Sequence, residues 1–238
     1  MNLLLLEPEN MSDSNIARIY GRQLQHLHKT LKAKVGDSLC VGMLNGMLGQ
    51  GKILELDDTQ ATLEINLSEP PPSTLPVRLV IALPRPKMLK RIIQTASTMG
   101  VKEIYFINSW KVEKSYWQSP WLTQEKIKEN LVLGLEQARD TLLPQIYQKA
   151  LFKPFVEDEL PGIIAGKTAL LAHPGSEEPC PVGLIDKECT LVIGPEGGFT
   201  PYEVEKLVEA GCKSVHLGER ILRVETAVPV LLSRLYCN

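Results

Sequence analysis

A proline-rich stretch, SEPPPSTLP at residues 68–76, constrains the fold more than any other feature of the sequence. Proline has no N–H to donate to a sheet ladder and its φ is fixed, so four prolines this close together predict an extended connector. The pattern changes across the connector. Short runs of β character precede it, whereas apolar strands alternate with helical periods after it. The sequence therefore predicts two domains, residues 1–70 and residues 77–238.

The N-terminal part is typical of a small antiparallel β-barrel. Its β-like runs cover residues 38–44, 52–56 and 61–67, and they are separated by the turn-like segments NGMLGQG and LDDTQ. The chain starts MNLLLLEPEN, and four leucines are too few for a signal peptide or a membrane span. We expect them to form a buried first strand, and we expect no membrane partner.

The C-terminal part alternates strands with helices, which predicts an α/β domain with a mostly parallel sheet. Strands are expected at 77–83, 103–108, 168–173, 189–194 and 213–218. Helices are expected from Pro86 to Gly100, from Thr123 to shortly before Pro144, from Pro201 to Ala210, and from about Thr226, which places Pro229 in the first turn.

Charge and cysteine content exclude several classes of protein. Lys and Arg number 26 against 28 Asp and Glu, so contact with nucleic acid needs a local basic face and not the bulk charge. The five cysteines are scattered and none has C-x-x-C spacing, which argues against a disulfide framework and against a metal site. We therefore expect a cytoplasmic protein without a bound metal.

The segment LVIGPEGGFT at residues 191–200 is the first candidate site. Thr200 and Glu203 form a capping box around Pro201, so the glycines before them lie in a strand-to-helix turn. Ligands of open α/β sheets bind at such turns, and Gly197 and Gly198 would let the backbone approach one closely. A tight turn that only needs positive φ is the alternative. The spacing matches neither a dinucleotide-binding motif nor a P-loop.

A second segment, LGERILRVETA at residues 217–227, again follows an apolar strand and gathers charged side chains before a last helix. A solvated loop would explain the charges alone. Together, however, IGPEGGFTPYEVE and LGERILRVETA resemble the RsmE-type 16S ribosomal RNA (uracil-N3) methyltransferases of the SPOUT superfamily. LEQARDTLLP at 135–144 and HLHKTLKAKVGD at 26–37 resemble further elements of that family.

The resemblance implies a SPOUT-type α/β trefoil-knot domain preceded by a small PUA-like β-barrel. It also implies a homodimer, S-adenosylmethionine as cofactor, and small-subunit ribosomal RNA, assembled or nearly assembled, as partner. The residues that would bind the cofactor are Leu171, Ala172, His173, Gly175, Ile193, Gly194, Pro195, Glu196, Gly197, Gly198, Leu217, Gly218, Arg220, Ile221, Leu222, Arg223, Thr226 and Ala227.

The chain departs from the family pattern on the substrate side. Thr95 and Thr98 stand where a lysine and a glutamate are usual, and Val224 stands where a threonine is usual. Lys32 and Lys114 replace arginines, which loses the planar fork suited to phosphate. A SPOUT enzyme acting on another RNA, such as transfer RNA, and a non-catalytic RNA-binding paralogue are the alternatives.

The implied chemistry narrows the roles of the remaining polar residues. N3 of neutral uracil carries a proton, which must leave as the methyl group arrives. Arg223 would stabilise the developing imide anion, and Glu225 or Glu196 is the available carboxylate. We expect Glu196 to be structural, bonding loop N–H groups.

Two segments are candidates for RNA contact. Residues 18–34 carry five cations and no acid, a density suited to phosphates. These cations are Arg18, Arg22, Lys29, Lys32 and Lys34. SWKVEKSYWQSPW at 109–121 interleaves lysines with aromatics that could stack on bases or could be buried at a domain or subunit contact.

Overall fold

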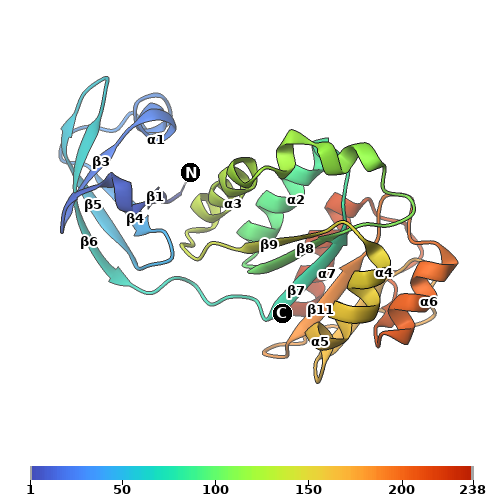
Figure 1. The fold of residues 1–238 in the computed structure, drawn as a ribbon. Helices are drawn as coiled ribbons and strands as arrows, with labels where there is room; N and C mark the ends of the chain where they lie inside the picture. Colours follow the sequence, from blue (N-terminus) through green and yellow to red (C-terminus); the bar gives the residue numbers. More distant parts are fainter. Residues whose placement is uncertain (1, 237–238) are drawn as a thin grey trace. The chain divides into compact units, whose positions relative to one another are not determined.

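The computed structural model describes residues 2–236, which form two compact units (Figure 1). The first unit comprises the chain up to Ser73 together with Leu131–Leu143, and the second comprises Thr74–Asn130 together with the chain from Pro144. Helix α3, Gln124–Ala138, is therefore divided between the two units. The sequence did not predict that its second half groups with the N-terminal strands.

The first unit is built on a six-stranded mixed sheet with the order β1-β4-β5-β6-β3-β2. Its strands are β1 Leu4–Leu6, β2 Met11–Asp13, β3 Ile16–Ile19, β4 Ser38–Met43, β5 Leu48–Leu56 and β6 Ala61–Glu69. The predicted buried first strand is confirmed, because all three residues of β1 are buried. The prediction of a purely antiparallel barrel is wrong, because β1 pairs with β4 in parallel after the long crossover through β2 and β3.

The segment NGMLGQG is a turn only in its first half, which corrects the sequence prediction. Strand β5 already begins at Leu48 and contains the last two glycines. A Cβ on Gly49 would overlap the Asn66 carbonyl oxygen, and one on Gly51 would lie 2.7 Å from the Val41 side chain. These glycines therefore permit close approach within the sheet and do not form a turn.

A short helical segment covers this sheet. It consists of α1, Gly21–His26, continued by a π-helical turn, η2, at Leu27–Leu31, and a 3₁₀ turn, η1, lies at Pro8–Asn10. Leu24 of α1 and Leu27 of η2 are buried in the apolar core that covers this sheet. A second apolar cluster joins Leu3 and Leu5 to Leu135 of α3. Burial of these side chains explains why residues 131–143 belong to the first unit.

A buried carboxylate connects α1 to α3 within this unit. Glu136 is 1% exposed, and its two oxygens lie 2.9 Å from the two Nη atoms of Arg22. Gln23 Nε2 also donates to Glu136, over 3.1 Å. Arg22, which the sequence suggested for phosphate contact, is thus engaged by a carboxylate that has almost no access to water.

The second unit contains a six-stranded sheet in the order β12-β10-β11-β7-β8-β9, and every neighbouring pair is parallel. Its strands are β7 Val77–Ala82, β8 Glu103–Ile107, β9 Gln145–Lys149, β10 Thr168–Ala172, β11 Cys189–Ile193 and β12 Lys213–Val215. Its helices are α2 Pro86–Thr98, α4 Phe152–Pro154, α5 Leu160–Ile164, α6 Pro201–Glu209 and α7 Val224–Tyr236, with helical turns η3 Lys114–Gln118, η4 Pro120–Leu122 and η5 Phe155–Glu159. The predicted parallel α/β sheet is confirmed.

Helices lie on both faces of this sheet, with α4, α5 and α6 on one side and α2 and α7 on the other (Figure 1). The sequence did not predict β9, α4 or α5. It also placed the start of the last helix too late. The helix begins at Val224, because the Arg223 carbonyl already accepts the N–H groups of Thr226 and Ala227. Pro229 therefore lies inside the helix and not in its first turn.

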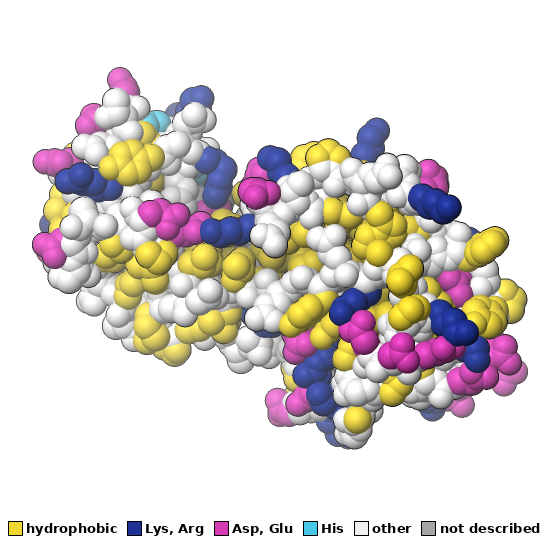
Figure 2. Space-filling view, in the orientation of Figure 1, with side chains coloured by type: hydrophobic (Ala, Val, Ile, Leu, Met, Phe, Trp, Pro, Cys, Tyr) yellow, Lys and Arg dark blue, Asp and Glu magenta, His cyan; other side chains and the backbone are white. Residues whose placement is uncertain are grey.

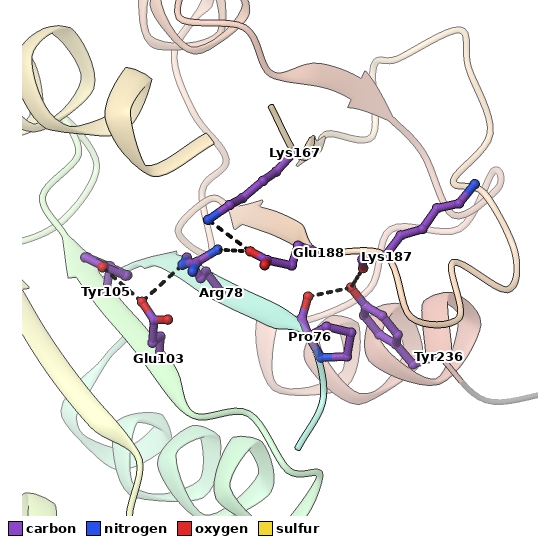
Figure 3. A network of polar contacts seen from close by, with 8 residues as sticks. All are labelled: Pro76, Arg78, Glu103, Tyr105, Lys167, Lys187, Glu188 and Tyr236. Atoms are coloured by element: carbon purple, nitrogen blue, oxygen red, sulfur yellow. Dashed lines mark hydrogen bonds and ion pairs between the residues drawn. The ribbon is translucent and has the colours of Figure 1, made fainter. Parts of the chain in front are cut away.

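Ion pairs join four strands at the amino-terminal edge of the sheet (Figure 3). Arg78 of β7 lies between Glu103 of β8, at 3.1 Å, and Glu188 just before β11, at 2.9 Å. Lys167, just before β10, also contacts Glu188 at 2.9 Å. Hydrogen bonds from Arg78 and Lys167 lower the pKa of Glu188. The hydroxyl of Tyr236 donates to the carbonyls of Pro76 and Lys187, which fastens the end of α7 to the same edge.

The surface has no dominant charge on the face shown in Figure 2, where basic and acidic side chains are interspersed.

None of the helices within residues 2–236 is both long and apolar enough to cross a bilayer. Cys40, Cys180, Cys189 and Cys212 are free thiols, and Cys237 lies outside the described residues.

Arg22→Ala should destabilise the first unit, because it leaves the Glu136 carboxylate buried with Gln23 as its remaining side-chain donor. We expect a loss of about 2–3 kcal/mol in the free energy of unfolding, at the lower end for a broken buried pair because half of Arg22 is in water. Urea denaturation measures it. Arg18→Ala removes an exposed arginine from β3 and should change stability by less than about 0.5 kcal/mol. Equal effects of the two substitutions would contradict this role of Glu136.

Candidate active site

Three loops leave the sheet side by side at its carboxyl-terminal edge. Strand β10 lies between β12 and β11, and all three run in the same direction. The loops after them begin at His173, Gly194 and His216. They contain the three segments that the sequence analysis proposed for cofactor binding. The fold therefore brings together segments that are 20 or more residues apart in the chain.

The first loop follows Leu171 and Ala172 at the end of β10. The His173 N–H donates to the Val215 carbonyl, 2.9 Å away, so this residue joins the first loop to β12 through its backbone. A Cβ on Gly175 would lie 3.0 Å from His173 Nε2. The histidine ring thus packs over Gly175, and this glycine provides the room for it.

The second loop turns tightly at its glycines. Ile193 and Pro195 are buried, and the Gly198 N–H donates to the Pro195 carbonyl over 2.8 Å. Gly198 has φ +71°, and none of the described atoms lies within 4 Å of the position that its Cβ would take. A Cβ on Gly194 would instead lie 3.0 Å from the Phe199 ring. Positive φ and open space coincide only at Gly198 in this turn.

Glu203 anchors this loop to its neighbour. The predicted capping box is confirmed, since Glu203 Oε2 accepts the N–H and the hydroxyl of Thr200 while the Thr200 hydroxyl accepts the Glu203 N–H. Its other oxygen, Oε1, accepts the Trp110 N–H over 2.7 Å. Glu203 is only 3% exposed. One buried carboxylate therefore holds both the start of α6 and the segment that follows β8.

Two further contacts reach the second loop from adjacent strands. Glu196 Oε1 accepts the Arg85 N–H over 3.1 Å, so Glu196 bonds the backbone after β7. Lys111 Nζ donates to the Gly197 carbonyl over 2.7 Å. Sequence reasoning missed Arg85 and Lys111. No local sequence signal indicates these two contacts. They follow from the strand order β11-β7-β8, which places the carboxyl ends of the three strands next to one another.

The third loop is more exposed than the other two. Gly218 has φ +111° with no described atom within 4 Å of its Cβ position, and its N–H donates to His216 Nδ1 over 2.9 Å. Leu217 and Leu222 are half-buried, and Arg220 is exposed. Ile221, which the family resemblance implies for cofactor binding, is 81% exposed. Its side chain does not pack within the described chain.

The first turn of α7 completes the arrangement. Arg223 lies directly before the helix with its side chain exposed, and its carbonyl caps the helix. Glu225 and Ala227 are half-buried in the first turn, and Thr226 is exposed. A guanidinium and a carboxylate thus stand close together in sequence at the edge where the three loops meet.

The cations proposed for RNA contact belong to the first unit. Arg18 is on β3, Lys29 is in the π-helical turn, and Lys32 and Lys34 follow it; all four are exposed. Lys32 has φ +49°, a left-handed conformation that ends the turn.

The aromatic segment after β8 divides into buried and exposed parts. Trp117 is half-buried and its Nε1–H donates to Asn108 Oδ1 over 3.1 Å. Trp121 is also half-buried, under Lys90 and Lys126, whose Nζ atoms lie 5.4 and 5.8 Å from its ring. Burial, followed by the hydrogen bond to Glu113, raises the pKa of Tyr116. Trp110 is 84% exposed.

Comparisons with known proteins agree with this architecture. A family model described as RNA methyltransferase domain matches residues 71–236. Ribosomal RNA small subunit methyltransferase E of Treponema pallidum is 28% identical over 237 residues, covering 95% of this chain and 87% of the relative. The protein of the same name from Synechocystis is 26% identical over 239 residues, covering 98% and 76%.

A solved structure is similar over almost its whole length. Ribosomal RNA small subunit methyltransferase E of Neisseria gonorrhoeae, bound to S-adenosyl methionine, superimposes with a TM-score of 0.76 at 21% identity, covering 98% of this chain and 95% of that chain. At this identity the similarity establishes the fold. The family model covers well over half of the chain, and this chain therefore belongs to the RNA methyltransferase domain family.

Proposed function

We propose that this protein transfers a methyl group from S-adenosylmethionine to N3 of a uridine in 16S ribosomal RNA of the small subunit. The observation that carries the proposal is the convergence of three loops at the carboxyl ends of β12, β10 and β11, two of them with glycines at positive φ facing open space. Relatives named ribosomal RNA small subunit methyltransferase E support the choice of RNA. Such a substrate places the activity in the cytoplasm.

The residues at this edge suit a ligand that has a flat aromatic ring and is approached by backbone groups. A Cβ on Gly198 or Gly218 would extend into the open space beside the loops. Leu217 and Leu222 are half-buried next to Gly218 and offer apolar surface for adenine. S-adenosylmethionine supplies an electrophilic methyl group when it is bound. The similar protein of Neisseria gonorrhoeae, solved with this cofactor bound, supports the assignment.

Arg223 and Glu225 would act on the uracil. The Glu225 carboxylate would accept the N3 proton as the methyl group is transferred, and a preorganised guanidinium stabilises the negative charge that develops on the imide. Arg223 is exposed directly before α7, and none of the hydrogen bonds or ion pairs found among residues 2–236 uses its guanidinium. Glu225 is the carboxylate beside it. Glu196 is held by the Arg85 N–H instead, in keeping with a structural role.

A trefoil knot in the second unit is part of this proposal. The segment between β10 and β11 hydrogen-bonds to the last turns of α7, from Gly183 N to Arg234 O at 3.1 Å and from Leu184 N to Leu235 O at 2.6 Å. Arg234 Nε also donates to the Cys180 carbonyl over 2.7 Å. The end of the chain is therefore bound along a long earlier loop, as threading through that loop requires.

RNA binding would involve the first unit as a PUA-like domain. Arg18, Lys29, Lys32 and Lys34 are exposed and available to phosphates. Arg22 is a poorer candidate, because the buried Glu136 carboxylate already binds it. A homodimer would complete the active site, and Val230 of α7, 39% exposed, is an apolar residue that a partner subunit could cover.

Gly198→Ala should weaken binding of S-adenosylmethionine at least tenfold, because a Cβ would enter the space that the ligand needs. Isothermal calorimetry measures the affinity. Gly166→Ala is a matched control: Gly166 also has φ +71° and an open Cβ position, but it lies before β10 at the opposite edge of the sheet. Both substitutions should lower stability by about 1–2 kcal/mol through backbone strain. Equal affinities in the two variants would remove the second loop from the cofactor site.

Ribosomal RNA from cells with and without the gene should differ by one N3-methyluridine in mass spectrometry.

Arg223→Ala should bind cofactor and RNA within a few-fold of the parent but lose about two orders of magnitude in single-turnover rate, because one preorganised charge is gone. Arg223→Lys keeps the positive charge but loses the planar guanidinium, so its single-turnover rate should lie between those of the parent and the Arg223→Ala variant.

Arg91→Ala is the control. It removes an exposed arginine from α2 and should leave the single-turnover rate at the parental value. A parental rate in the Arg223→Ala variant would exclude Arg223 from the mechanism. A methyl group found on transfer RNA, on a ring carbon or on a ribose hydroxyl would contradict the proposed target.

The parent should scatter light as a particle of twice the chain's mass at micromolar concentration. Val230→Glu should shift it towards the monomer, because a charge would then be buried in the subunit contact. Val182→Glu, at an exposed valine between β10 and β11, is the control and should leave the dimer intact. A monomeric parent would contradict the proposed homodimer.

A further inference from the structure

Trp110 is the most exposed of the large apolar side chains that reach the surface of the described chain, at 84%. Trp117 and Trp121, in the same segment, are half-buried. Trp117 donates to the side-chain oxygen of Asn108, and Trp121 lies under two lysines. Leaving an indole in water forgoes the burial that usually makes this residue favourable. Packing within the chain therefore explains the other two tryptophans but does not explain Trp110.

The backbone around Trp110 is firmly held. The Val112 N–H donates to the Ser109 carbonyl over 3.0 Å, so Trp110 occupies the tip of a tight turn whose two end residues are buried. The N–H of Trp110 itself donates to the buried Glu203 carboxylate. On its other side, Lys111 Nζ donates to the Gly197 carbonyl. The backbone that carries the indole is thus fixed beside the loop that contains Gly197 and Gly198.

The nearby charges favour an anionic partner. Arg85, just before α2, and Lys111 and Lys114, after β8, are all exposed. The acids among them have donors already: Glu113 accepts the hydroxyl of Tyr116, and Glu196 accepts the Arg85 N–H. An aromatic ring near exposed cations matches a ligand that combines phosphates with flat bases.

We propose that Trp110 stacks on an unpaired base of the RNA substrate next to the target uridine. The inference rests on the proposed function and adds a substrate-recognition residue to it. Base stacking needs an accessible ring on a well-positioned backbone, and the turn at 109–112 supplies both. A second copy of this chain is a less suitable occupant, because a two-fold contact would bring two copies of the same cationic surface together.

Binding of two labelled probes tests the proposal by fluorescence anisotropy. One is a short oligouridylate, and the other is a ribose-phosphate strand of equal length without bases. Trp110→Ala should bind the oligouridylate about tenfold more weakly than the parent and the abasic strand equally well, because only stacking is lost. Trp110→Phe should restore most of the affinity. The salt dependence should not change, since no charge is removed.

Leu151→Ala is the matched control, because Leu151 is 66% exposed in the same unit and lies outside the segments assigned to binding. It should bind both probes like the parent. Calorimetry with S-adenosylmethionine should give parental affinity for every variant. Light scattering should give the parental mass, and a Trp110→Ala variant that becomes monomeric would overturn the inference in favour of a subunit contact.

The remaining outcomes separate this inference from the proposed function. A parent that binds oligouridylate while Trp110→Ala matches it would overturn the role of Trp110 alone. A parent that binds neither probe and methylates no RNA would overturn the proposed function, and the role of Trp110 with it.

Discussion

Parallel pairing of β10 with β11 on one side and β12 on the other decides where this chain can do chemistry. Three strands that run the same way must release their loops at one edge, whatever the loops contain. The opposite edge has the ion pairs of Arg78 and Glu188, which hold the amino ends of β7, β8, β10 and β11. The ion-pair cluster of Arg78 and the candidate binding loops therefore lie at opposite ends of the same strands.

Two buried carboxylates fix the positions of the segments that they contact. Glu203 accepts hydrogen bonds from Thr200 and Trp110, and Glu136 contacts Arg22 and Gln23. A carboxylate with so little access to water is stable only when its oxygens have partners, so each one fixes the distance between the segments that supply them. The two residues play equivalent roles in the two units.

Local signals made much of the second unit predictable from sequence. The strand at Cys189–Ile193 and the helix from Pro201 were recognisable because an apolar run, glycines and a capping box follow one another within a few residues. Contacts between distant segments were not recognisable. Nothing near Glu203 indicates that its second oxygen holds Trp110, and nothing near Arg22 indicates a partner more than a hundred residues away.

The division of the chain has a consequence for its synthesis. The first unit needs Leu135 beside Leu3 and Leu5, so its apolar cluster cannot close while the ribosome has made only the N-terminal strands. The second unit needs Arg234 and Leu235 against the loop after β10, so this loop gains its partners only after α7 has been made. Such long separations along the chain slow folding. The first unit can therefore close once Leu131–Leu143 has been made, whereas the second unit also needs the much later segment of α7.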